Sequence, residues 1–428
     1  MGEGGRRLTA MPRVLILTLL FPPDGVSTAQ IMGDLAEDLG RSGHDVTVLT
    51  TTPHYNRDLD AEQRQPLSAY WGRLVQRSTF RGCPVYHTAM PRKSGSVVLR
   101  LTAWMLFHFL SLVVGIVCVR RVDVIVSPSP PLTVGIVAWL LGWWHRAPYI
   151  YNVQEIYPDI AINLGAVRQR WLIEILYALE RFVYARAARV TVIANRMRSR
   201  LMEKGVPSSK VALIPNFVDA DALLPVPRPN DFSRQFDLDS AFVVSYAGNF
   251  GPAQGLETLL DAASQLRDSP GIVIVLVGGG ILWDALRERI ADDGLHNVRL
   301  IAFQPFAIVP QIYGASDVCV VSQAVTTGTD AVPSKVYRIM SCRRPVLAAT
   351  DPASDLAQLV RDAGCGAVVP QQSAAQMSAT IRAAFADQPA WRAMGERGRE
   401  HVLAQYARPV VTEQYHQLIG SLVGGTRT

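Results

Sequence analysis

Residues Ser322 to Thr350, SQAVTTGTDAVPSKVYRIMSCRRPVLAAT, predict a loop, a helix and a strand. Pro333 stands near the expected first position of the helix, where a missing N–H costs nothing. A helix start after a small Thr/Gly loop presents unsatisfied N–H groups and the positive end of the helix dipole, which together favour a phosphate. Lys335 and Arg338 follow, three residues apart. They are either an anion-binding pair or an ordinary solvated helix face.

The chain of 428 residues is too long for one hydrophobic core and predicts two domains of about 200 residues each. Apolar residues make up 49% and charged residues 18%, the composition of a folded, rather hydrophobic protein. Five widely spaced cysteines without a CxxC pair indicate neither a disulfide framework nor a zinc site. A reducing cytosol fits this cysteine usage best.

Positive charge is concentrated in the first half of the chain. Residues 1–215 contain 25 Lys/Arg against 15 Asp/Glu, a balance of +10, and the remainder contains 17 against 21, a balance of −4. Basic surface beside apolar surface suits an anionic membrane face, with nucleic acid as the other usual partner. Since no nucleic-acid motif is present, we expect no nucleic-acid partner.

The first buried unit begins at residue 14. Residues 14–20 are apolar, an apolar helical spacing follows over 31–39, and residues 46–50 predict a second strand, the βαβ unit of a parallel sheet. Gly25 lies in the first turn, where backbone can approach a ligand, although plain turn chemistry is the commoner reason. No small-residue cleavage site follows the apolar run, so a signal peptide is excluded and residues 1–11 are expected to be a disordered leader.

Residues 101–119 form the most hydrophobic stretch, with only Thr102, His108 and Ser111 polar. This length suffices to span a bilayer, but a span would separate the next strand from its sheet partners. Residues 134–144 are similarly apolar and carry three tryptophans suited to the headgroup level. A helix lying on the membrane is therefore favoured over helices buried in the core and over a true span.

Polar residues follow the strand predicted at 148–153. Gln154, Glu155 and Asp159 stand at its C-terminal end, the edge at which open α/β sheets bind ligands. The two carboxylates suit acid/base or hydroxyl-binding work, whereas Asp159 equally suits a helix cap.

A Pro-rich run at 224–229 marks the junction between the domains. The α/β alternation then repeats, with glycine-rich turns at 248–255 and 278–280 that lie on one sheet edge and are able to cradle a diphosphate with backbone N–H groups. We predict an N-terminal domain over 12–222, a linker over 223–240, a C-terminal domain over 241–405, and a helix over 406–428 that packs back on the first domain.

These landmarks together resemble the GT-B glycosyltransferases, and within them the retaining family 4. The matching segments are FPPDG at 21–25, GHDV at 43–46, IPNFVD at 214–219, YAGN at 246–249, VGGG at 277–280, ASDV at 315–318 and VPSKVY at 332–337. NVQEIYPD and YAGNFGPAQG are similar to a branch that builds bacterial O-antigen, capsule and colanic-acid-like polysaccharides, including fucosamine transferases. The resemblance implies two Rossmann-like doubly wound domains facing across a cleft, with membrane-associating helices in the first.

The chain departs from the family pattern at several expected site positions. The usual pair of glutamates eight apart falls on Asp330 and Arg338, and the usual phosphate-binding Arg and Lys fall on Asn249 and Gln254. A common histidine appears as Gln154. Lys335 and Arg338 are candidates to replace the lost positive charge. The resemblance implies that substrate is bound by Gly25, Gln154, Gly248, Asn249, Gln254, Gly279, Thr329, Ser334, Lys335 and Arg338.

By resemblance, the expected activity is transfer of a sugar, with retention, from a UDP- or other nucleotide-diphosphate donor to a polyprenyl-diphosphate-linked acceptor at the cytoplasmic face of the inner membrane. Asp330 is assigned to sugar-hydroxyl contact, and Glu155 or Asp159 to acceptor positioning or base work. No cofactor and no metal are expected, since no Asp-x-Asp signature stands out. The alternatives are a sugar-nucleotide epimerase of the same architecture and a catalytically lapsed membrane-bound scaffold.

Overall fold

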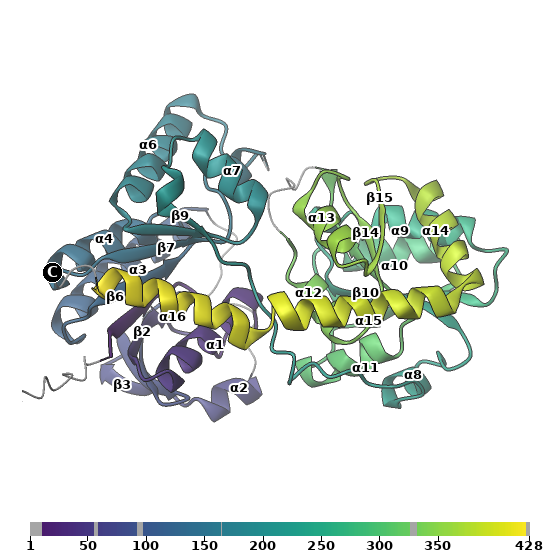
Figure 1. Ribbon diagram of the computed structural model, residues 1–428, viewed down its shortest axis with the longest axis horizontal. Helices are drawn as coiled ribbons and strands as arrows, with labels where there is room; N and C mark the ends of the chain where they lie inside the picture. Colours follow the sequence, from purple (N-terminus) through teal and green to yellow (C-terminus); the bar gives the residue numbers. More distant parts are fainter. Residues whose placement is uncertain (1–10, 55–58, 92–96, 164, 326–331, 425–428) are drawn as a thin grey trace, which may run out of the picture.

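The computed structural model describes residues 11–54, 59–91, 97–163, 165–325 and 332–424, which form two α/β domains lying side by side (Figure 1). The prediction of two Rossmann-like domains is confirmed. Strands of the first domain lie between residues 13 and 213, and strands of the second lie between residues 242 and 369.

The first domain contains, within the described residues, a nine-stranded sheet of order β3-β4-β5-β2-β1-β6-β7-β8-β9. Its strands are β1 (Arg13–Leu17), β2 (Asp45–Thr51), β3 (Ser68–Trp71), β4 (Val75–Phe80), β5 (Cys83–Thr88), β6 (Val124–Pro128), β7 (Tyr149–Val153), β8 (Arg189–Val192) and β9 (Val211–Leu213). All neighbours are parallel except β3–β4 and β4–β5. This antiparallel extension lacks the long apolar runs of the central strands and was not predicted from the sequence.

Central strands of this sheet are apolar on both sides because helices cover both faces. Leu15 and Leu17 belong to one buried cluster, and Val14 and Ile16 belong to another on the opposite face. The two clusters alternate residue by residue because successive side chains of a strand point to opposite faces of the sheet. The helices are α1 (Ser27–Arg41), α2 (Leu59–Arg64), α3 (Val97–Val117), α4 (Val134–His145), α5 (Asp159–Asn163), α6 (Arg170–Arg186) and α7 (Asn195–Glu203).

The hydrophobic segments at 101–119 and 134–144 form α3 and α4, which pack closely against each other. A Cβ atom at Gly115 would lie 2.6 Å from Leu141, so glycine is needed for this approach. Phe107 and Val114 are fully buried, whereas Met105 and Phe109 on the same helix are 72% and 64% exposed. Helices of the described residues include none with the length and apolar character needed to cross a membrane.

The second domain has, in the described chain, a six-stranded parallel sheet of order β12-β11-β10-β13-β14-β15. The strands are β10 (Phe242–Asn249), β11 (Ile272–Gly279), β12 (Val298–Ala302), β13 (Val318–Ser322), β14 (Val346–Ala349) and β15 (Gly366–Val369). The helices are α8 (Asp231–Gln235), α9 (Glu257–Gln265), α10 (Trp283–Asp292), α11 (Val309–Gly314), α12 (Lys335–Ser341), α13 (Asp355–Asp362), α14 (Ala374–Ala386) and α15 (Gln388–Gln405).

The chain passes between the domains twice, and the two crossing segments are hydrogen-bonded to each other. The Val218 N–H donates to the carbonyl of Tyr406 (3.0 Å), and the Arg408 N–H donates to the carbonyl of Val218 (2.9 Å). The last helix, α16 (Arg408–Gly424), then lies on the first domain in line with α15 (Figure 1).

Charged and polar contacts hold α16 on the first domain. The buried Arg408 guanidinium pairs with Asp34, Glu37 and Asp38 of α1 and with Asp219. Tyr415 accepts a hydrogen bond from the Asn152 amide (2.9 Å). These contacts thus fix the second crossing segment, at Tyr406 to Arg408, to the first domain.

Candidate active site

Two glycine-rich turns of the second domain lie against each other at the C-terminal ends of β10 and β11. A Cβ atom at Gly278 (φ +153°) would lie 1.9 Å from the carbonyl oxygen of Gly248, so both the backbone angle and the close approach require glycine. The Phe250 N–H donates to the carbonyl of the predicted residue Gly279 (2.8 Å). The predicted glycines therefore build one compact loop surface at the edge expected to bind ligands.

Lys335 brings a cation to this loop surface from the first residue of α12. Its Nζ donates to the Tyr246 hydroxyl (2.7 Å), lies 3.8 Å from the centre of that ring, and is 3.5 Å from Gln254 Oε1. A Cβ atom at Gly248 would lie 2.9 Å from the same Nζ. Lys335 thus stands beside Gln254, the position to which the family resemblance assigns a phosphate-binding lysine.

Burial, followed by the nearby charge of Arg338, lowers the pKa of Lys335 to about 7. Arg338 donates from Nη2 to Gln30 Oε1 (2.9 Å), lies over the ring of Phe306, and has its own pKa lowered by burial. Among the described residues, neither cation makes an ion pair with a carboxylate. The solvated-face alternative is therefore wrong, since both side chains are partly buried and hydrogen-bonded to protein groups rather than exposed to water.

Helix α12 is shorter than the sequence suggested. It starts at Lys335 rather than at Pro333, and it has 7 residues, with Ser334 as its N-cap. A short helix contributes a weaker dipole, so side-chain cations carry more of the anion-binding potential than the helix start does. Ser334 makes a hydrogen bond through its Oγ to Ser27 Oγ (2.9 Å) rather than capping the helix.

The first domain faces this site through the start of α1. Ser27 and Gln30 contact Ser334 and Arg338, respectively, across the domain boundary. The predicted Gly25 is exposed and directly precedes this helix. Contacts between residues far apart in the sequence therefore bring the C-terminal edges of the two sheets together.

Glu155 and Asp159, the two carboxylates after β7, have different surroundings. Asp159 pairs with Lys204 (2.8 Å) and Arg200 (3.4 Å). The partly buried Glu155 carboxylate, in contrast, has no hydrogen-bond partner within the described part of the chain, and burial raises its pKa. Of the two, Glu155 is the carboxylate with the properties of a general base.

Gln154 is held inside the first domain. Its Nε2 donates to Asn152 Oδ1 (2.7 Å), and its Oε1 accepts from Asn216 (2.9 Å). Both ends of the amide are used in a buried network that also reaches Tyr415 of α16 through Asn152. This environment fits a positioning role better than direct substrate contact.

The remaining predicted residues lie at the loop surface or outside the described residues. Asn249 is exposed at the end of β10, with its carbonyl accepting from the Tyr246 hydroxyl (2.9 Å). Gln254 accepts from the same hydroxyl (3.1 Å). Thr329 and Asp330 lie outside the described residues.

One acidic residue near the first-domain edge was missed by the sequence analysis. Asp24 is buried between β1 and α1, and its Oδ1 accepts the His54 N–H (3.0 Å). Its position beside Gly25, directly after the first strand, was the available signal.

Comparison with known proteins agrees with this geometry. Residues 28–216 match the family model described as a glycosyl transferase 4-like domain, and residues 228–401 match the model of glycosyl transferases group 1. The protein is a glycosyltransferase. The glycosyltransferase also shares its two-domain GT-B fold with solved structures. A structure of Anabaena Alr3699/HepE with UDP-glucose superposes with a TM-score of 0.72 at 16% identity, covering 96% of this chain and 100% of that one.

Some curated relatives of the glycosyltransferase are named for bacterial polysaccharide or lipopolysaccharide synthesis. It is 25% identical over 394 residues to a protein of Escherichia coli named "Putative colanic acid biosynthesis glycosyl transferase WcaI", covering 87% of this chain and 92% of WcaI. LpsE of Rhizobium meliloti, a lipopolysaccharide core biosynthesis glycosyltransferase, is 27% identical over 42% of this chain and 50% of its own. The structure of WaaG, involved in lipopolysaccharide biosynthesis, has a TM-score of 0.67 at 15% identity, covering 95% of this chain and 99% of WaaG.

Proposed function

We propose that this glycosyltransferase moves a sugar, with retention, from a nucleotide-diphosphate donor to a polyprenyl-diphosphate-linked saccharide in the synthesis of a bacterial surface polysaccharide. The observation that carries the proposal concerns two cations, Lys335 beside the glycine turns and Arg338 at the domain boundary. Neither has a carboxylate partner among the described residues. A leaving diphosphate needs such charge as its own negative charge develops. Structures of the similarly folded HepE hold UDP and UDP-glucose, which supports UDP as the donor nucleotide.

On the acceptor side, Glu155 is proposed to position or deprotonate the acceptor hydroxyl. The leaving phosphate oxygen is proposed to assist the hydroxyl on the same face of the sugar, so that no enzyme nucleophile is required. Asp330 remains proposed for sugar-hydroxyl contact. Neither a cofactor nor a metal is part of the proposal, because side-chain cations and loop amides supply the charge stabilisation.

The test incubates the purified protein with a panel of UDP-, GDP- and dTDP-sugars and polyprenyl-diphosphate-sugar acceptors. Formation of a lipid-linked product with the donor's anomeric configuration supports the proposal. Epimerisation of the free nucleotide sugar without lipid-linked product contradicts it, and an absence of turnover across the panel favours the lapsed scaffold.

The pH dependence of donor binding provides an independent check. With a pKa of about 7 in the empty protein, Lys335 is increasingly neutral at higher pH, so diphosphate binding must then take up a proton. We expect the donor Kd to rise with pH above about 7, by at most about tenfold per pH unit. Calorimetry in buffers of different ionisation enthalpy measures the proton uptake; the same pH profile in Lys335→Gln would contradict this assignment.

Membrane association is proposed from an apolar helix surface on the first domain. This surface consists of the exposed side chains Met105, Phe109 and Val117 of α3, Trp143 and Trp144 of α4, and Trp171 and Ile175 of α6. Figure 1 shows α3 and α4 on the side of the first domain away from the second. Exposed Arg120, Arg121 and Arg146 follow the ends of these helices. Tryptophan beside arginine suits an anionic bilayer surface such as the cytoplasmic face of the inner membrane.

Flotation with vesicles containing phosphatidylglycerol tests this surface. We expect wild-type protein to bind and to resist release by salt, and Trp143→Ser/Trp144→Ser to partition on the order of tenfold less. Leu403→Ser, which alters an exposed leucine of α15, is the matched control and is expected to bind like wild type. Release of the wild-type protein by salt alone would contradict insertion of the apolar helix surface.

A further inference from the structure

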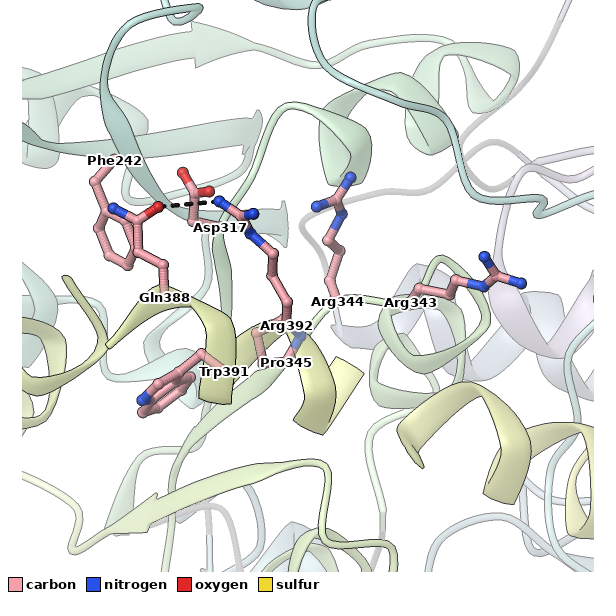
Figure 2. A pocket seen from close by; sticks show the side chains of 8 residues that line it. All are labelled: Phe242, Asp317, Arg343, Arg344, Pro345, Gln388, Trp391 and Arg392. Atoms are coloured by element: carbon pink, nitrogen blue, oxygen red, sulfur yellow. Dashed lines mark hydrogen bonds between the residues drawn. The ribbon is translucent and has the colours of Figure 1, made fainter. Parts of the chain in front are cut away.

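A groove in the second domain lies at the edge of the sheet opposite to the candidate active site. It has a volume of about 330 Å³, and its lining comes from the linker (Pro225, Val226, Pro227), the loop after α12 (Cys342, Arg343, Arg344) and α15 (Arg392, Glu396). A narrow adjoining cleft is lined by Phe242, Asp317 and Pro345 (Figure 2). These three residues begin or precede β10, β13 and β14, so the groove lies at the N-terminal edge, whereas Gly248 and Lys335 lie at the C-terminal edge.

Positive charge exceeds negative charge in the groove. Three arginines line it against one acid, Glu396, which pairs with Arg343 (3.2 Å). Arg392 donates from Nη2 to the neutral Gln388 Oε1 (3.2 Å) (Figure 2). In the described chain Arg392 makes no ion pair, so its charge is uncompensated.

Arg344 adds a further guanidinium that makes no ion pair among the described residues. Its Nη2 donates to the carbonyls of Val226 (3.2 Å) and Gly314 (2.9 Å), and its buried Nε has no hydrogen-bond partner among the described residues. Burial lowers the pKa of this guanidinium, although the nearby Asp317 carboxylate acts to raise it. Because Asp317 is already paired with Arg228 (2.9 Å), Arg344 and Arg392 leave the groove with an excess of positive charge, which suits an anion.

Backbone features hold the three arginines in place. A Cβ atom at Gly395 would lie 2.3 Å from the carbonyl oxygen of Arg343, so glycine lets α15 approach the loop and brings Arg392 and Glu396 beside it. Arg343 itself has a left-handed backbone (φ +57°) just after α12, where glycine is usual and another residue costs about 1 kcal/mol. An arginine is present there despite this cost.

We propose that this groove binds a small phosphate-bearing anion, such as inorganic phosphate or diphosphate, between Arg344 and Arg392. Guanidinium groups match phosphate oxygens with paired N–H donors. The bound anion would connect the linker to α15, and these two segments lead to the hydrogen-bonded crossings at Val218 and Arg408. Occupancy of the groove is therefore expected to make the two crossing segments between the domains more rigid. This inference does not depend on the identity of the sugar donor or acceptor.

Titration of the full-length protein with inorganic phosphate and with diphosphate, at constant ionic strength set by chloride, tests the groove. We expect saturable binding that raises the unfolding temperature, and an apparent Kd weakened about tenfold or more in Arg392→Gln. Arg397→Gln is the matched control, because Arg397 lies on the same helix, is exposed and donates to the Gly364 carbonyl instead.

Lys335→Gln separates the groove from the donor site, which also attracts phosphate. Groove binding is expected to keep its affinity in Lys335→Gln and to weaken about tenfold or more in Arg392→Gln. Loss in Lys335→Gln with full retention in Arg392→Gln would overturn the proposal, as would a phosphate effect no larger than that of chloride. If Arg392→Gln does not fold, Arg343→Gln, at a half-exposed position, is expected to weaken phosphate binding by lowering the net positive charge of the groove.

Discussion

Lys335→Gln is expected to raise the KM for the sugar-nucleotide donor about tenfold to a hundredfold, equivalent to about 1.4–2.7 kcal/mol of binding free energy. Nζ of Lys335 lies at the loop surface that Gly248 and Gly278 build, beside Gln254. In this position the ammonium is the cation nearest to the expected diphosphate, and glutamine retains a hydrogen-bonding group while removing the charge. The measurement is steady-state kinetics with donor as the varied substrate.

Thermal unfolding distinguishes this loss from a folding defect. Because burial already disfavours the charged amine, removing the charge is expected to leave the unfolding temperature unchanged or higher. Arg338→Gln should raise the donor KM in the same direction. Arg287→Gln is the control, since Arg287 makes an exposed ion pair with Asp284 on α10 and is expected to change KM less than about twofold. An unaltered donor KM in both Lys335→Gln and Arg338→Gln would refute the charge-replacement hypothesis.

Glu155→Gln is expected to lower kcat about a hundredfold to ten-thousandfold, the usual contribution of a general base, with little change in the donor KM. The carboxylate is partly buried, unpaired in the described chain and held with a raised pKa, all of which suit proton transfer. Glutamine preserves the shape of the side chain and removes its basicity. Single-turnover kinetics with saturating donor measures the chemical step.

Asp159→Asn provides the contrast to Glu155→Gln. Asp159 pairs with Lys204, which also binds the buried carboxylate of Glu180. The Asp159→Asn variant is expected to lower the unfolding temperature and to change kcat little, because the substitution weakens the pairing of a partly buried charge. A large loss of kcat in Asp159→Asn together with a near-normal Glu155→Gln would reverse the two assignments.

Much of the fold was predictable because parallel sheets leave a strong local signal. Residues 14–17 form a continuous apolar run, since helices cover both faces of β1. The antiparallel hairpin of β3 and β4 was not predicted, because the exposed β3 and the half-buried β4 both lack such a run. The start of α12 was misplaced by two residues, since Pro333 is compatible with both the last loop position and the first helical position.

The candidate site was predictable by residue type but not by role. Lys335 and Arg338 were recognised as possible anion ligands, yet their local pattern equally suited a solvated helix face. Glu155 and Asp159 were equivalent in the sequence. Only their partners, Lys204 for Asp159 and none in the described chain for Glu155, separate them.

The sequence by itself determined the α/β class, the order of the two domains and the glycine-rich turns, because these depend on short-range periodicity and on backbone angles. Tertiary structure decided which charges are compensated. Lys335 and Tyr246, Arg338 and Gln30, and Arg344 and Val226 are each separated by at least 89 residues. A charge is costly or useful according to the burial and partners that such distant contacts create, and neither is encoded in the local sequence pattern.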